Sequence, residues 1–108
     1  MEPAEQSALS QALDQLWARF LPQIEERVSI LESAAAAISA DQLSTAQREA
    51  ASAAAHKLAG VLGTFGLARG TDLARELEVT YSREGVPAPS AHIATITAEL
   101  RAIVASRK

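Results

Sequence analysis

One histidine of this chain stands among glycines that helix interiors normally avoid. His56 opens the run HKLAGVLGTFG, which ends at Gly66. An exposed imidazole is mostly neutral at pH 7 and keeps a lone pair on one ring nitrogen, so it can act as a nucleophile. Glycine inside a helix costs about 1 kcal/mol relative to alanine, so Gly60 and Gly63 together forgo about 2 kcal/mol of helix stability. Because alanine is abundant here, the two glycines indicate a requirement other than helix stability.

The two glycines share one helix face with the histidine. At about 100° per residue, Gly60 lies about 40° from His56 around the helix, and Gly63 lies about 20° to the other side. The other residues within about 60° of His56 are also small: Ser52, Ala53 and Ala59. The opposite side of the helix is an apolar stripe made of Leu58, Val61, Leu62 and Phe65. We therefore expect a histidine that a partner protein can approach closely; the plainer alternative is an ordinary surface histidine.

The elements that position this histidine are predicted to be helices. Leu9, Leu13, Leu16, Phe20, Ile24, Val28 and Leu31 recur every three or four residues, as in one buried helical stripe. Pro22 interrupts the stripe, so we expect a helix over 5–20 and a second over 22–39. Ser44 and Gln47 form a capping-box pattern that predicts a helix start, and Gly66 predicts the end of that helix after Thr64.

Two further helices follow in the sequence. The turn at 67–70 predicts a helix over 71–83 that turns Leu73, Leu77 and Tyr81 inward. A loop over 85–89 precedes a last helix capped by Ser90, with Ile93, Ile96, Leu100, Ile103 and Val104 inward. Short connections favour antiparallel neighbours. The predicted fold is one all-α domain over 1–108: an up-and-down four-helix bundle (22–108) preceded by a short extra N-terminal helix (1–20), with Trp17 and Phe20 covering one end.

Composition excludes several classes of function. The 108 residues suffice for one domain, and aromatic residues make up only 4%. There is no cysteine, which excludes disulfides, thiolate metal sites and cysteine nucleophiles. The net charge of −3 offers no footprint for nucleic acid or an anionic membrane. No apolar run approaches a membrane span and the first residues begin no secretory signal, so a cytoplasmic location is expected. The segment 60–63 matches a GxxG loop of RNA-binding KH domains, but the acidic balance and the absence of predicted strands exclude that class.

The run from His56 to Gly60, followed by Gly63 and Gly66, resembles the signature of histidine-containing phosphotransfer (HPt) domains, the helical-bundle carriers of phosphorelays. The resemblance continues through Leu73, Ala74, Leu77 and Glu78. It implies that Nε2 of His56 accepts a phosphoryl group from the aspartate of a response-regulator receiver domain and donates it to a second receiver. The receiver supplies Mg²⁺ and its own lysine, so the resemblance implies no cofactor or metal held by this chain. It also implies a sensor histidine kinase as a partner.

Position 59 departs from the family pattern. HPt domains commonly carry a lysine three residues after the histidine, where it can neutralise the phosphoryl group, and this chain has Ala59 there. Lys57 lies about 100° from His56 around the helix, so its ammonium either reaches the phosphoryl oxygens through a long stem or is simply solvated. We therefore expect slower phosphorylation or a less stabilised phosphohistidine than in lysine-bearing relatives. Two alternatives stay open: a degenerate relative that binds a receiver or another protein without phosphotransfer, and a metal- or ligand-binding bundle.

The remaining polar residues are expected to be structural or solvated. His92 is predicted to be a surface or capping neighbour near the start of the last helix. A further set is predicted to form solvated helix faces: Glu25, Glu26, Arg27, Arg75, Glu76 and Glu78. No ATP-binding motif is visible, which predicts a carrier of phosphoryl groups and not a kinase. A monomer is expected, because the small-residue face is suited to a transient partner.

Overall fold

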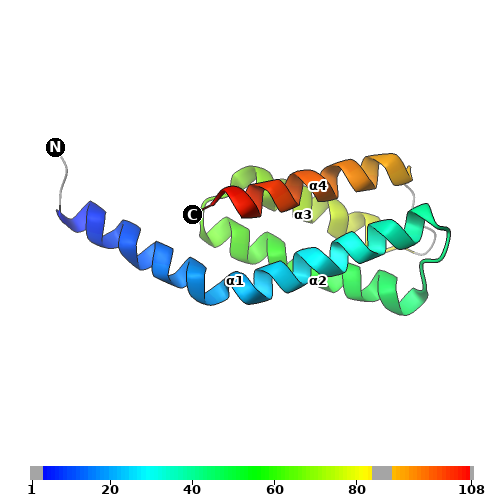
Figure 1. The fold of residues 1–108 in the computed structure, drawn as a ribbon, viewed down its shortest axis with the longest axis horizontal. Helices are drawn as coiled ribbons and strands as arrows, with labels where there is room; N and C mark the ends of the chain where they lie inside the picture. The colour runs from blue at the N-terminus through cyan, green and yellow to red at the C-terminus, as the bar shows by residue number, and fades with distance from the viewer. Residues whose placement is uncertain (1–3, 84–88, 108) are drawn as a thin grey trace.

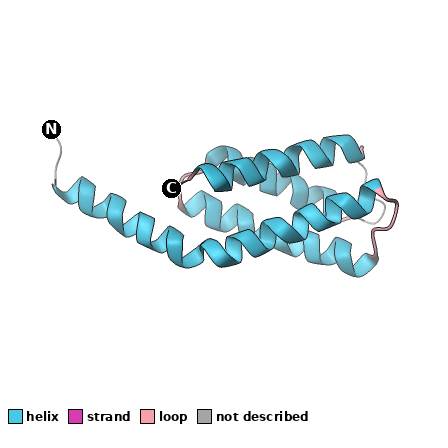
Figure 2. Cartoon of the chain, viewed as in Figure 1, coloured by secondary structure: helices cyan, strands magenta, loops and turns pink. Residues whose placement is uncertain are grey.

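The computed structural model describes the backbone of residues 4–83 and 89–107, and the side chains from residue 8 onward. These residues form four helices and no strand: α1 (Ala4–Ser39), α2 (Thr45–Thr64), α3 (Ala68–Tyr81) and α4 (Ser90–Ser106) (Figures 1 and 2). Helix α2 packs on α3, α3 on α4, and α1 on both α2 and α4. This closed order confirms the predicted all-α four-helix bundle.

The predicted break at Pro22 is wrong, because α1 is a single helix of 36 residues with the proline inside it. Figure 1 shows that the helix axis changes direction between the blue and cyan stretches of α1, so proline bends this helix without ending it. Pro22 has no N–H to donate to the carbonyl of Ala18, four residues earlier. Because Ala18 is exposed, water can satisfy that oxygen. Trp17 and Ile24 are buried on either side of the proline and hold both parts of α1 on one core.

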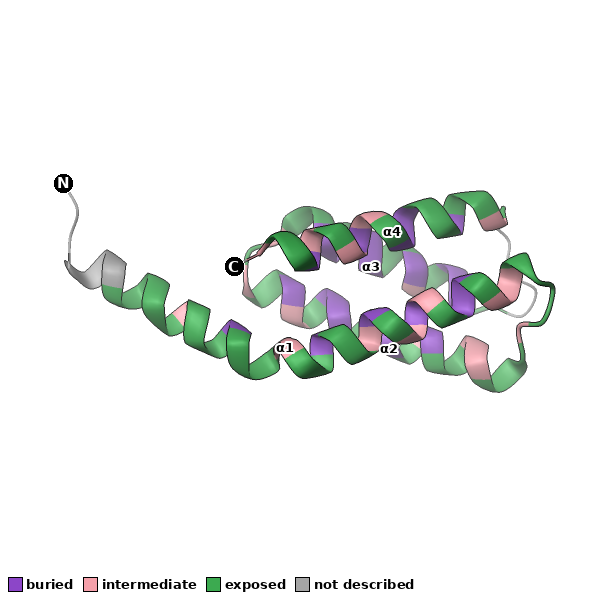
Figure 3. Ribbon diagram, in the orientation of Figure 1, coloured by how far each residue is buried: buried purple, intermediate pink, exposed green. Residues whose placement is uncertain are grey.

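Only part of the long apolar stripe of α1 is buried. Figure 1 shows the first part of α1 extending beyond the bundle, and Figure 3 shows it mostly exposed. Leu9 is 60% exposed and Leu16 is 38% exposed, whereas Ile24, Val28 and Leu31 are fully buried. The prediction of one buried stripe is therefore wrong for Leu9 and Leu16, because this part of α1 extends beyond the bundle.

An aromatic cluster closes the end of the bundle where α1 leaves it. Phe65 packs edge-on against Trp17 and Phe20, at centroid distances of 5.2 and 6.4 Å. The Arg107 guanidinium lies 5.2 Å from the Trp17 ring centroid, and it also donates to Asp14 Oδ1 at 2.9 Å. Trp17 is buried but Phe20 is 37% exposed. The predicted role of these two aromatic side chains at one end of the bundle is thus confirmed, with Trp17 as the residue that seals it.

Helix α2 begins and ends where the sequence predicts. Ser44 is its N-cap: its hydroxyl accepts from Gln47 N at 3.0 Å, and Gln47 Oε1 accepts from Ser44 N at 3.5 Å. At the other end Gly66 adopts φ +73°, a left-handed conformation that glycine reaches without strain. The amide of Leu67 then bonds to Leu62 O at 3.0 Å, which closes the turn.

Helix α3 begins at Ala68, three residues before the predicted start. Gly70 therefore lies inside the helix and is buried, although the sequence placed it in a turn. A Cβ at this position would lie 3.1 Å from Leu62 Cδ1 and 3.3 Å from Ile103 Cγ2. Glycine thus lets α3 pack closely against α2 and α4, and this packing outweighs its low helix propensity.

The last helix differs from its prediction only at the start. Ser90 is the first residue of α4 and not its cap, since Pro89 is the N-cap and makes no side-chain cap bond. Residues 84–88, which include most of the predicted loop over 85–89, lie outside the described residues. The predicted inward side chains are buried, apart from Ile103, which is partly buried. Within the described part of the chain, no helix combines the length and hydropathy that crossing a membrane requires.

Candidate functional site

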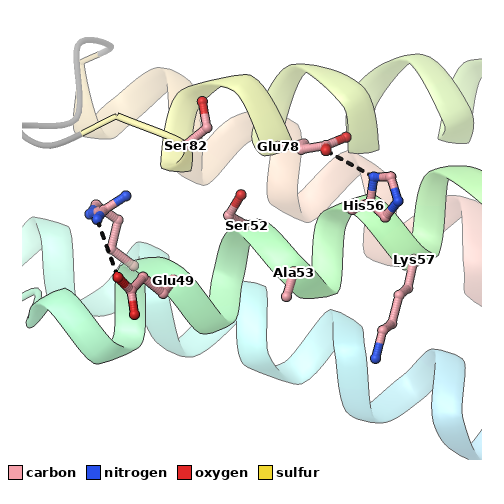
Figure 4. A pocket seen from close by; sticks show the side chains of 8 residues that line it. Glu49, Ser52, Ala53, His56, Lys57, Glu78 and Ser82 are labelled. Carbon is pink, nitrogen blue, oxygen red and sulfur yellow. Dashed lines mark hydrogen bonds and ion pairs between the residues drawn. The ribbon is translucent and has the colours of Figure 1, made fainter.

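The candidate site is a shallow groove between α2 and α3, with His56 on its α2 edge (Figure 4). The imidazole is 73% exposed, and its Nδ1 lies 2.9 Å from Oε2 of Glu78 on α3. Glu49, Ser52 and Ser82 line the same groove. Figure 4 shows the ring of His56 turned toward Glu78, while the groove beside it stays open.

This contact determines which ring nitrogen can react. An ionised carboxylate only accepts hydrogen bonds, so Nδ1 of His56 carries a proton and donates it to Glu78. In the neutral ring the lone pair then resides on Nε2, the nitrogen farther from the helix backbone. The glutamate both orients the imidazole and stabilises positive charge that develops on it when Nε2 bonds to an electrophile.

The glycines beside His56 are not required by packing against the residues that the structure describes. A Cβ on Gly60 would meet no atom within 4 Å, and one on Gly63 would meet only Thr71 Oγ1, at 3.6 Å, an ordinary contact. Both glycines are exposed, Ala53 is exposed, and Ser52 is half-buried. The structure therefore brings these four residues onto one face with His56, as the helical projection predicts.

One residue of the predicted site does not lie where the sequence placed it. Ala59 is only 6% exposed and belongs to the core, and its carbonyl lies 3.5 Å from Thr71 Oγ1. Helix α3 covers it, because the groove edge of α2 faces α3. Lys57 is exposed, but Figure 4 shows its side chain directed away from the imidazole. Of the two alternatives for Lys57, this conformation is the solvated one.

Sequence reasoning missed Glu78 and placed it on a solvated face. A signal was present: His56 and Glu78 each lie 11 residues from Leu67, in the turn between α2 and α3. In an antiparallel helix pair, residues at equal distances from the turn lie opposite each other. Glu25 and Glu76 were also predicted to be solvated, and they bind Arg101 at 3.2 Å and His92 at 2.7 Å.

Arg48 holds the two helices of the site in register. Its Nη1 donates to the carbonyl of Tyr81 at 2.7 Å, which joins the first turns of α2 to the last residue of α3. Its Nη2 lies 3.9 Å from Oε2 of Glu49. Because a carbonyl at a helix end has no partner within the helix, this bond also satisfies a group that would otherwise need water. The Arg48–Tyr81 hydrogen bond thus helps to fix the relative position of the two helices that carry His56 and Glu78.

His92 lies apart from the groove, as the sequence predicts. Its Nε2 lies 2.7 Å from Oε2 of Glu76, and the contact joins α4 to α3. In the part of the chain that the structure describes, no group of three or more histidine and carboxylate side chains is placed to hold a metal ion.

Comparison with known proteins identifies the family. A model of the Hpt domain family matches residues 15–106, which is most of the chain. The chain belongs to the Hpt domain family. Hpt domains are phosphotransfer carriers of two-component signalling, without kinase activity of their own.

One curated relative of this Hpt domain is Protein RcaC of Microchaete diplosiphon, 39% identical over 66 residues. The match covers 61% of this chain and 10% of the relative, so the chain corresponds to a small part of that protein. No solved structure matches the chain. The helical bundle and the family assignment agree on the fold; the structure has His56 exposed on the second helix.

Proposed function

We propose that His56 is the phosphoacceptor of this Hpt domain, taking a phosphoryl group from a receiver aspartate and passing it to the aspartate of a response-regulator receiver. The observation that carries the proposal is the His56–Glu78 hydrogen bond on an otherwise open face. It presents Nε2 to an incoming protein and leaves room for that protein over Gly60 and Gly63.

The transfer step forms one bond to phosphorus and breaks another. Nε2 of His56 attacks the phosphorus of the acyl phosphate, the Nε2–P bond forms, and the bond from phosphorus to the aspartate oxygen breaks. The aspartate leaves as a carboxylate with the electron pair. The ring gains positive charge while its Nδ1 proton stays in the hydrogen bond to Glu78. Donation to the second receiver is the reverse step.

Partners and cofactors follow from this chemistry. The receiver domain brings Mg²⁺ and its own lysine, so the Hpt domain contributes the imidazole and a docking surface. A sensor histidine kinase, through a receiver linked to it, is the proposed source of the phosphoryl group. We propose that the transfer takes place in the cytoplasm and that this chain acts as a monomer. A molar mass of one chain by light scattering supports the monomer, and a dimer would implicate the exposed stripe that includes Leu9 and Leu16.

The test uses the two histidines as a matched pair. The chain is incubated with a phosphorylated receiver, and an acid-labile, alkali-stable label is followed. We expect His56→Gln to abolish labelling and His92→Gln to keep it, since His92 has a similar carboxylate contact outside the groove. Labelling that survives in His56→Gln and is lost in His92→Gln contradicts the assignment.

A second candidate, a scaffold that binds a receiver without phosphotransfer, is favoured by one observation. Position 59 holds a buried alanine where relatives commonly have a lysine. A wild-type chain that binds a receiver and takes up no label supports this candidate. Glu78→Gln separates the phosphoryl carrier from the receiver-binding scaffold further. For a carrier we expect transfer to slow about tenfold while receiver binding is kept, because the amide stabilises the charged ring less well than a carboxylate.

A further inference from the structure

The groove around His56 carries acidic side chains, and neither of the two α2 cations that line it, Arg48 and Lys57, contacts the imidazole. Glu78 contacts the imidazole, and Glu49 lines the same groove two turns earlier along α2. Ala59 is buried, and Lys57 is directed away from the ring. A phosphoryl group on Nε2 therefore brings negative charge to a face where the α2 cations are bound elsewhere or directed away.

The neighbouring helix carries a cation near the level of the missing lysine. His56 contacts Glu78, and a Cβ on Gly63 would contact Thr71. In both pairs the two residue numbers add up to 134, which defines the antiparallel register of α2 and α3. By this register Arg75 lies within about one helical turn of the level of Ala59, whose carbonyl is near Thr71. Arg75 lies three residues before Glu78, about 4.5 Å along the helix axis and on the same side of α3.

Of the arginines on α2 and α3, Arg75 is the one whose side chain could move to bind a new group. Its side chain is exposed, and it makes no hydrogen bond or ion pair with the described residues. Arg48 is bound to the Tyr81 carbonyl, and Arg69 is bound to Glu99 at 2.7 Å. The acidic neighbour of Arg75 on the groove side, Glu78, is already engaged by His56.

We propose that Arg75 binds the phosphoryl group on His56, taking from α3 the part that a lysine at position 59 plays in relatives. This inference rests on the proposed function of His56. The guanidinium presents several N–H donors in a planar fork that matches two phosphoryl oxygens, and it stays charged at every pH of interest. Gly60 adds no side chain between the two helices at this level, so the long arginine stem can lie across the groove. Because the contact exists only after phosphorylation, it favours the phosphorylated form of the Hpt domain.

The decisive experiment compares two exposed cations beside the site. Arg75→Gln and Lys57→Gln remove the same charge; Lys57 lines the groove with its side chain directed away from the imidazole, whereas Arg75 is carried by α3, three residues before Glu78. The equilibrium constant for transfer from a phosphorylated receiver to His56 is measured for each variant. We expect about a tenfold fall for Arg75→Gln, the equivalent of about 1.4 kcal/mol, and less than twofold for Lys57→Gln. Arg75→Lys should fall in between, because a lysine keeps the charge without the fork.

A receiver-free measurement separates phosphoryl binding from docking. Potassium phosphoramidate phosphorylates imidazoles directly, and the half-life of the phosphohistidine is then followed by ³¹P NMR. We expect a shorter half-life in Arg75→Gln, and a shift of the Arg75 Nε–Hε resonance on phosphorylation of the wild type, while the Arg69 resonance stays in place.

The outcomes separate the two proposals. A wild type that takes up no label from either donor overturns the proposed function, and this inference with it. A labelled His56 whose equilibrium constant and half-life are equal in Arg75→Gln and Lys57→Gln overturns this inference alone. Thermal melting of each variant checks that the bundle is intact; a substitution at an exposed position should leave it unchanged within about 0.5 kcal/mol.

Discussion

Replacing Gly60 by alanine should stabilise the bundle and impair transfer at the same time. Gly60 lies inside α2 with helical backbone, and an added Cβ would meet no atom within 4 Å. The substitution therefore gains the full propensity difference, about 0.5–1 kcal/mol, with no packing cost inside the chain. For a domain of this size the gain raises the melting temperature by about 4–8 °C per kcal/mol.

Transfer should respond in the opposite direction. The new methyl group stands about 40° from His56 around the helix, on the face that a receiver must approach. A small displacement of the reacting atoms is enough to slow transfer about tenfold, the equivalent of about 1.4 kcal/mol in the barrier. The assays are thermal denaturation by circular dichroism and the initial rate of label transfer from a phosphorylated receiver.

Gly70→Ala is the matched control, because its Cβ would lie 3.1 Å from Leu62 Cδ1. The propensity gain is then offset by overpacking of about 1–3 kcal/mol, so the melting temperature should fall. A lower melting temperature in Gly60→Ala refutes the packing argument. A higher melting temperature with an unchanged transfer rate refutes the argument that this glycine keeps the docking face clear.

Three further predictions concern stability and pH. Burial raises the pKa of Tyr81 to about 12, and its hydroxyl has no described partner, so Tyr81→Phe should be neutral or stabilising by up to about 1 kcal/mol in urea unfolding at pH 7. Because the folded pKa is raised, the wild type should lose stability between about pH 10 and 12, whereas Tyr81→Phe should not; a parallel loss in both proteins contradicts this account. The Arg101 hydrogen bond lowers the pKa of Glu32, so the ion pair stabilises the folded protein at pH values above the ordinary glutamate range. Glu32→Gln should therefore lower the free energy of unfolding by about 0.5–1 kcal/mol at pH 7. The difference from the wild type should vanish once the pH falls below the lowered pKa. Ser44→Ala removes the N-cap of α2 and should cost about 1 kcal/mol by thermal melting; equal melting temperatures would show that the cap contributes little.

Predictions from local signals succeeded where the deciding contacts are local. The start of α2 depends on Ser44 and Gln47, three residues apart, and its end depends on the left-handed conformation of Gly66. Both can be predicted because residues close in sequence make these contacts whatever the rest of the fold does.

Predictions failed where burial by other elements outweighs local preference. Pro22 and Gly70 are both unfavourable inside helices, yet both lie inside them. Trp17 and Ile24 hold α1 to one core across the proline, and Gly70 is kept by its contacts with Leu62 and Ile103. Such contacts join residues far apart in sequence, so no window of sequence shows them.

The sequence by itself determined that this chain is all-helical and that its histidine stands on a small-residue face, since both follow from spacing along single helices. Only the tertiary structure decided that Glu78 contacts the imidazole and that Ala59 is covered by α3. These facts depend on the register between α2 and α3, which the turn at Leu67, the glycine at position 70 and the Arg48–Tyr81 hydrogen bond establish together. A shift of that register by one turn would preserve both helices and remove the site.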